Sequence, residues 1–175
     1  WGRKDPFLGS SSISESIVAA STGKWNFERS QSATIGNTEE NPTTFYRVRS
    51  NIGNCWSEKK TEYDPCPYGL VIPHNSYFWW TGNEPVFDLN NHGISLSLGE
   101  GTEIQTAWYP ASGHLDIWDG LTDVGTFGYY TTAHRYPGTV HEDAYGLCFN
   151  TVTSEFTVGD SYSINWGQSI RCIKE

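Results

Sequence analysis

Basic residues are scarce in this sequence, and their scarcity excludes whole classes of partner. The 175 residues include 11 lysines and arginines against 20 acidic residues, which gives a formal net charge of −9. Nucleic acids need a basic surface to meet their phosphates, and anionic membrane surfaces need the same. We therefore expect no nucleic-acid partner.

Long apolar runs and methionine are missing too. No stretch approaches the roughly 20 apolar residues of a membrane-spanning helix, so we expect no direct membrane insertion. The chain starts at Trp1 without a methionine or a recognisable signal peptide. We expect a trimmed piece of a longer protein, whose anchor or pilin-like domain lies upstream. Because no repeat or composition break divides it, residues 1–175 are predicted to form one domain.

The common catalytic motifs are absent as well. The sequence has no P-loop, GxGxxG, HExxH or GxSxG pattern. Its five histidines lack metal-ligand spacing: His74, His92, His114, His134 and His141. The acidic pairs Asp116 with Asp119 and Glu142 with Asp143 are better interpreted as solvated surface than as a hydrolase pair. We expect no enzyme activity and no cofactor.

A calcium site is the alternative considered for the stretch "LDIWDGLTD". Asp116, Asp119 and Asp123 place oxygens in a loop, as that ion prefers, but their spacing is not that of an EF-hand. We therefore predict that neither these residues nor Glu84 bind a metal.

Aromatic residues, by contrast, are abundant. They make up 15% of the chain, with 8 Trp and 10 Tyr, and charged residues only 18%, a composition typical of extracellular β-rich binding proteins. The four cysteines, Cys55, Cys66, Cys148 and Cys172, form no CxxC pair. Their even number favours disulfides and an oxidising compartment. Four cysteines permit three pairings, and spacing alone selects none.

Short alternating runs broken by Gly, Pro and Asn predict strands joined by long loops. One short helix is predicted in Ser12–Thr22. The candidate strands are "TFYRV" (44–48), "GLVIP" (69–73), "GISLSL" (93–98), "EIQTAWYP" (103–110), "GTFGYYTT" (125–132), "YGLCFN" (145–150) and "SIRCIKE" (169–175).

Six motifs in one order carry a family resemblance. They are "WGRKDPF" at Trp1, "NPTTFY" at Asn41, "YDPCPYGLVIP" at Tyr63, "WYPASGHL" at Trp108, "VGTFGYY" at Val124 and the terminal "SIRCIKE". Together they resemble the Fibrobacter succinogenes major paralogous domain and the related C-terminal domains of Bacteroides-type fimbrillin-like surface proteins. The resemblance spans the whole chain.

The resemblance implies an α+β fold, namely the C-type lectin-like fold of the formylglycine-generating-enzyme type, with antiparallel strands, long loops and few short helices. It also implies a Cys66–Cys172 disulfide, because those two positions match the family's recurring cysteines. Cys55 and Cys148 are additional, and either pair with each other or stay free.

Departures from the family pattern restrict the functions that the resemblance can imply. The catalytic cysteine pair of the formylglycine-generating enzymes has no counterpart, and the calcium-and-sugar motifs of lectins are missing, apart from the fragment Glu84-Pro85. The segment from Asn150 to Gln168 keeps no family pattern, whereas "SIRCIKE" restores it. A subset of the family serves as the variable protein of diversity-generating retroelements, in which rewritten codons near the gene's 3′ end alter one ligand-binding surface.

That layout predicts a displayed binding surface made of rigid aromatic and small polar side chains. The predicted ligand-binding residues are His134, Tyr136, His141, Asp143, Phe156, Asp160, Tyr162, Asn165, Trp166 and Gln168. For Trp166, an inward-facing role in the core is an equal alternative.

The function that follows is a non-catalytic ligand-binding domain, either an adhesin or a receptor-binding protein. Its partner would be a protein or glycan on another cell or host surface. Its location would be extracellular or on the cell surface, in a pilus tip or outer-membrane lipoprotein, or else on a phage particle. The alternative is a structural fimbrillin or lipoprotein module without a variable site.

Overall fold

Strands are the only regular secondary structure in the described part of the chain. The structure is a computed structural model that describes residues 26–28, 44–46, 59–60, 64–74, 84–98, 105–116, 120–135, 143–163 and 166–174. These residues contain twelve strands and no helix. The expected α+β fold of the C-type lectin-like type is therefore wrong for this part of the protein, which is all-β. The helix predicted in Ser12–Thr22 lies outside the described residues.

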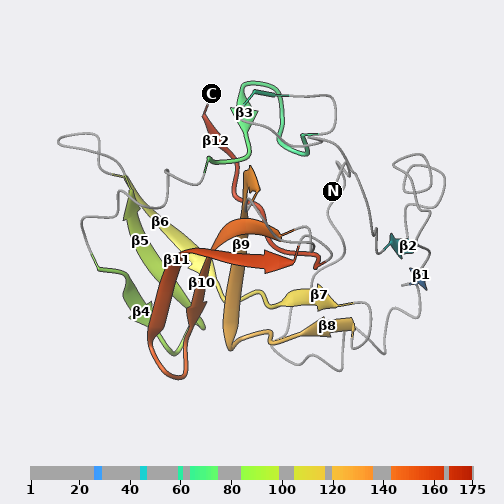
Figure 1. Cartoon of the computed structure of the whole chain (residues 1–175). Coiled ribbons are helices and arrows are strands. Elements are labelled where there is room, and N and C mark those ends of the chain that lie inside the picture. The colour runs from blue at the N-terminus through green and yellow to red at the C-terminus, as the bar shows by residue number, and fades with distance from the viewer. Residues whose placement is uncertain are drawn as a thin grey trace.

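The strands follow each other along the chain as Figure 1 shows. They are β1 (Asn26–Glu28), β2 (Thr44–Tyr46), β3 (Leu70–Val71), β4 (Val86–Asp88), β5 (Gly93–Leu98), β6 (Gln105–Pro110), β7 (His114–Asp116), β8 (Gly120–Thr122), β9 (Phe127–Arg135), β10 (Asp143–Asn150), β11 (Glu155–Ser163) and β12 (Ile173–Lys174).

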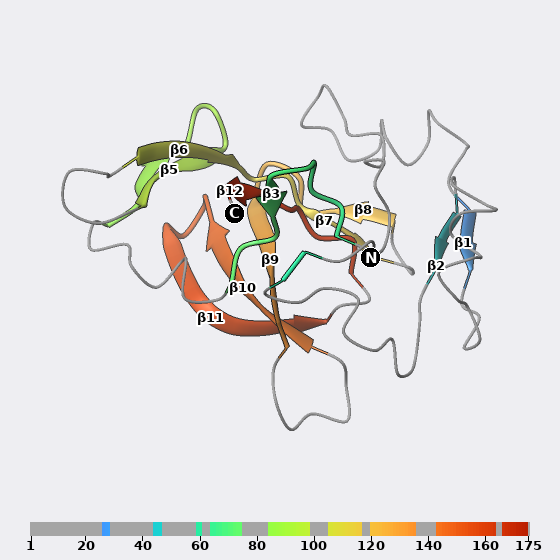
Figure 2. The ribbon, with the colours of Figure 1, turned by 90° about the horizontal axis from the view of Figure 1, so that it is seen from above.

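Two three-stranded antiparallel sheets enclose the main core. One has the order β4-β5-β6 and the other β11-β10-β9, and Figure 2 shows them as two layers. Period-two alternation turns Ile94 and Leu96 of β5 inward, where neither side chain is exposed. They meet Leu147 and Phe149 of β10 in one apolar cluster. This core fixes the position of both sheets.

Smaller pairings complete the described fold. Strands β7 and β8 form an antiparallel pair, as do β12 and β3, while β1 and β2 are parallel. The chain near Gly167 pairs with β7, because the backbones of Leu115 and Gly167 exchange hydrogen bonds of 3.0 and 2.8 Å. Ser169 then pairs with β9, since its N–H donates to the Tyr129 carbonyl at 2.9 Å. The C-terminal segment is thus attached to both strands.

The disulfide between Cys66 and Cys172 is present, which confirms the pairing implied by the resemblance. The two Cα atoms are 5.7 Å apart and the cysteines are separated by 106 positions. The bond joins the loop before β3 to the segment before β12. Of the additional cysteines, Cys148 is buried with a free thiol, and Cys55 lies outside the described residues.

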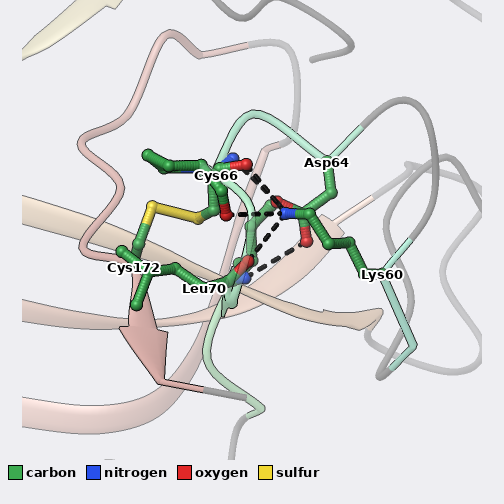
Figure 3. Close-up of polar contacts among 7 residues, drawn as sticks. Lys60, Asp64, Cys66, Leu70 and Cys172 are labelled. Carbon is green, nitrogen blue, oxygen red and sulfur yellow. Dashed lines mark hydrogen bonds and ion pairs between the residues drawn. A yellow bond between two sulfur atoms is a disulfide. The ribbon is translucent and has the colours of Figure 1, made fainter.

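A buried carboxylate and an ammonium group hold the loop that carries Cys66 (Figure 3). Asp64 is 2% exposed and accepts hydrogen bonds from the N–H groups of Cys66 (2.7 Å) and Ile72 (3.3 Å). Lys60 Nζ lies 3.6 Å from Asp64 Oδ1 and donates to the carbonyls of Cys66 and Leu70, each at 2.7 Å. The loop is therefore fixed by charge as well as by the disulfide.

No described residue belongs to a helix with the length and apolar character that crossing a membrane requires.

Candidate functional site

Strand β11 lies in the segment from Asn150 to Gln168 where the predicted display surface is concentrated. It pairs with β10 with one irregularity: Leu147 faces Val158 and Gly146 faces Asp160, so Gly159 has no partner. Gly159 has a φ of 83°, in the left-handed region that glycine adopts without steric cost. This is a β-bulge, and it shifts the alternation of side chains along the strand.

The bulge separates the predicted residues of β11 between the two faces of the sheet. Before Gly159, the side chains of Phe156 and Val158 pack against the main core. After it, the Tyr162 ring lies over Gly146, where an added Cβ would be 3.3 Å from Tyr162 Cδ2. Asp160 is two positions before Tyr162, so its side chain points to the same second side, where it is exposed to solvent. Phe156 is therefore not on the same surface as Tyr162.

An aromatic cluster occupies the second side of the sheet. The ring centroid of Tyr162 is 5.5 Å from that of Tyr129 and 6.4 Å from that of Trp166. Trp166 contacts Tyr129 edge-on at 5.6 Å. We call Thr157, Asp160, Tyr162 and Trp166 the Tyr162 face. Thr157 and Asp160 are exposed, and Tyr162 and Trp166 are partly exposed.

The ring of His114 stacks against the ring of Trp166. Their rings stack with centroids 4.2 Å apart and planes inclined by 27°, and His114 also meets the edge of Tyr129 at 4.9 Å. Nδ1 of His114 lies 3.4 Å from Oδ2 of Asp123. Burial lowers the pKa of His114, and the carboxylates of Asp123 and Asp116 oppose that shift. His114 therefore stacks on Trp166 as a neutral ring at neutral pH.

The hydroxyl of Tyr162 and the Cys148 thiol beside it are protonated. The Tyr162 hydroxyl lies 3.3 Å from Thr157 Oγ1. Burial raises the pKa of the Tyr162 phenol, which is also hydrogen-bonded to Cys148. Burial likewise raises the pKa of the Cys148 thiol. The buried Cys148 thiol thus lacks the lowered pKa that an activated nucleophilic cysteine needs.

The other predicted residues divide into separate groups. His134 Nδ1 lies 3.1 Å from His74 Nε2, and its ring is 5.3 Å from Tyr145, so it belongs to a different cluster. Gln168 donates from Nε2 to the Ser163 carbonyl at 3.1 Å. Asp143 begins β10 opposite Ser163. Tyr136, His141 and Asn165 lie outside the described residues.

The supporting residues Tyr129 and His114 were missed by sequence reasoning. Tyr129 and Tyr130 are neighbours in β9, so alternation sends one to each side of the sheet. Tyr130 enters the main core and contacts Tyr109 at 5.0 Å. Two adjacent tyrosines in a predicted strand therefore could have indicated one tyrosine on each side of the sheet. The sequence around His114 gives no such indication, because the role of His114 depends on Trp166, which is far away in the sequence.

The carboxylates considered above as an alternative calcium site are only partly described by the structure. Asp119 lies outside the described residues, and Asp123 has a φ of 61° beside His114. Among the residues that the structure describes, no three His, Cys, Asp or Glu side chains gather as a metal site. That no metal is needed stays a prediction.

Comparison with known proteins gives no family assignment: no family model, curated protein or solved structure matches this chain significantly. The resemblance to the Fibrobacter-type domain therefore stays a hypothesis.

Proposed function

We propose that this chain is a non-catalytic ligand-binding domain, of the adhesin or receptor-binding kind, that acts on a cell surface or a phage particle. The Tyr162 face is its binding surface, and its ligand is a protein or glycan on another cell. The single observation that carries the proposal is the Gly159 bulge, which turns Tyr162 and Asp160 out of the main core.

The chemistry of the face suits recognition. Tyr and Trp supply stiff contact area at low entropic cost, and Thr157 and Asp160 add hydrogen-bonding groups beside them. Interfaces concentrate their binding energy in such aromatic residues. The protonated phenol of Tyr162 and the protonated Cys148 thiol next to it offer packing and hydrogen bonding, with no activated nucleophile.

The finer proposal is that a diversity-generating retroelement varies this face. It rests on the order of motifs in the sequence: family-like segments, then Asn150–Gln168 without family pattern, then "SIRCIKE". Strand β11 connects to the fixed sheet through its backbone ladder with β10. Backbone hydrogen bonds tolerate changed side chains, so exposed positions on this strand vary without loss of the fold.

A structural module is the second candidate, favoured by Phe156, which packs against the core instead of being displayed. Sequencing the gene in many isolates separates the two. The proposal predicts adenine-linked codon changes concentrated at positions of the Tyr162 face such as Thr157, Asp160 and Tyr162, with Phe156 kept apolar. Changes spread evenly over the gene, with no adenine bias, would contradict the retroelement proposal.

A further inference from the structure

The outward side of the β4-β5-β6 sheet carries an unusual set of residues. Alternation turns Ile94, Leu96 and Tyr109 into the core and leaves the opposite positions facing out. The outward row across the three strands is Val86, Ser95 and Trp108, which are direct cross-strand partners. This surface lies on the far side of the core from the Tyr162 face.

Trp108 lies flat on this surface because its neighbour has no side chain. A Cβ added at Gly93 would be 2.5 Å from Cζ2 and 2.8 Å from Cη2 of the Trp108 ring. The indole therefore covers Gly93, which is buried, while 36% of Trp108 stays exposed. The Arg171 guanidinium donates to the Trp108 carbonyl at 2.8 Å and fixes this part of β6.

Small hydroxyl groups lie along the sheet on the side of Trp108 that faces away from Gly93. Ser95 is the cross-strand partner of Trp108, and Ser97 Oγ lies 2.8 Å from Thr106 Oγ1 on the same side. Val86, 67% exposed, ends the row at the edge strand. Since neighbouring strands are about 4.8 Å apart, Val86 and Trp108 lie about 10 Å from each other.

One charged group lies at the end of this surface. Asp88 pairs with Gly93 across the strands, and its carboxylate accepts 3.1 Å hydrogen bonds from the N–H groups of Asn90 and Asn91. The side-chain amide of Asn91 also donates to it at 2.7 Å. These hydrogen bonds, chiefly that from the Asn91 side chain, lower the pKa of Asp88. The result is a fixed anionic acceptor beside a flat aromatic ring.

We propose that this surface, centred on Trp108, is a second binding site and that its ligand is a neutral oligosaccharide. The electron-rich face of an indole attracts the partly positive C–H groups on the apolar side of a pyranose ring. The ring's hydroxyls project sideways, where Ser95 donates or accepts and Asp88, the cross-strand partner of Gly93, accepts. The row from Trp108 to Val86 spans two strand spacings, and with about one sugar unit for each spacing it has room for about two units.

The complementarity is to an uncharged, hydroxyl-rich ligand. Among the described outward-facing residues of β4, β5 and β6, Asp88 is the one charged side chain. A stable protein partner would need more large apolar anchors than Trp108 and Val86 supply.

The test uses the full 175-residue chain and a panel of hexasaccharides: cello-, xylo-, manno- and maltohexaose. Titration calorimetry should show saturable binding to at least one of them. Trp108→Ala should weaken that binding about tenfold or more, and Trp108→Phe should weaken it less, because a smaller aromatic face remains. Tyr68→Ala, which removes a 99% exposed aromatic elsewhere, should leave it unchanged.

A second variant covers the case in which Trp108→Ala fails to fold. Val86→Arg changes an exposed position at the end of the same row and should weaken hexasaccharide binding without lowering the thermal midpoint. The inference is overturned if no sugar of the panel binds, or if Trp108→Ala or Val86→Arg binds it as the unchanged chain does. Self-association that Trp108→Ala abolishes would also overturn it, since a second copy would then be the occupant.

Discussion

Phe156 and Tyr162 belong to one strand and are separated by an even number of positions, yet their side chains lie on opposite faces of the sheet. Phe156 packs against the main core, and Tyr162 contacts Tyr129 on the other side. Strict alternation would place both on one face. The unpaired Gly159 between them accounts for the difference. The proposed binding surface therefore depends on one glycine.

Substitution of Gly159 tests this dependence. Gly159→Ala should lower the free energy of unfolding by about 1–2 kcal/mol, because an L-residue resists a φ of 83°. Urea denaturation followed by fluorescence measures the change. Ser161→Ala, in the same strand, is the matched control and should change stability little. A Gly159→Ala variant as stable as the unchanged chain would show that the bulge does not require glycine.

Removal of the disulfide should have the largest effect on stability. The bond joins residues 106 positions apart, and in the loop-entropy account a loop of that size contributes about 4–5 kcal/mol. The double variant Cys66→Ala/Cys172→Ala should therefore show a loss of this order in urea denaturation. Reductant should destabilise the unchanged chain similarly and leave the double variant unaffected. Equal sensitivity of both proteins to reductant would contradict the assignment.

His114 should make stability fall under mild acid. Burial lowers its folded pKa below the ordinary value of 6.5, so the unfolded chain takes up the proton first as the pH drops. Its contribution is complete above about pH 6.5 and is lost as the pH falls toward the folded pKa. His114→Phe, which keeps an aromatic ring against Trp166, should have a flatter profile of unfolding free energy over that window. Identical profiles would show that His114 is not the titrating group.

The strand positions were predictable where alternation is regular. In "GISLSL" the small and apolar residues alternate without interruption, and β5 covers that same stretch, Gly93–Leu98. In "SIRCIKE" only Ile173 and Lys174 form a strand, because the partner strand β3 has only two residues, Leu70 and Val71, with which to pair. The local sequence does not reveal how many partners a strand will find.

The fold class and the division of β11 were not predictable in the same way. The α+β expectation came from the family resemblance, whereas the described residues are all-β. The segment Glu155–Ser163 was not among the predicted strands, and its Phe156, Asp160 and Tyr162 were assigned to the displayed surface because Asn150–Gln168 keeps no family pattern. Phe156 and Val158 point toward the main core, whereas Asp160 and Tyr162, which follow the bulge, point to the other side of the sheet. Only the pairing with β10 shows where the alternation shifts.

The central claim is that the Tyr162 face binds a ligand without supporting the fold. The most direct measurement compares binding of fluorescently labelled protein to a panel of bacterial and host cells with the free energy of unfolding, for Tyr162→Ala and Asp160→Ala. Tyr68→Ala is the control, since Tyr68 is a fully displayed tyrosine elsewhere. We predict that Tyr162→Ala weakens cell binding by about 2 kcal/mol, roughly thirtyfold, and Asp160→Ala by less, while both variants stay folded. Unchanged cell binding by folded Tyr162→Ala and Asp160→Ala, or unfolding of the domain by Tyr162→Ala, would contradict the claim.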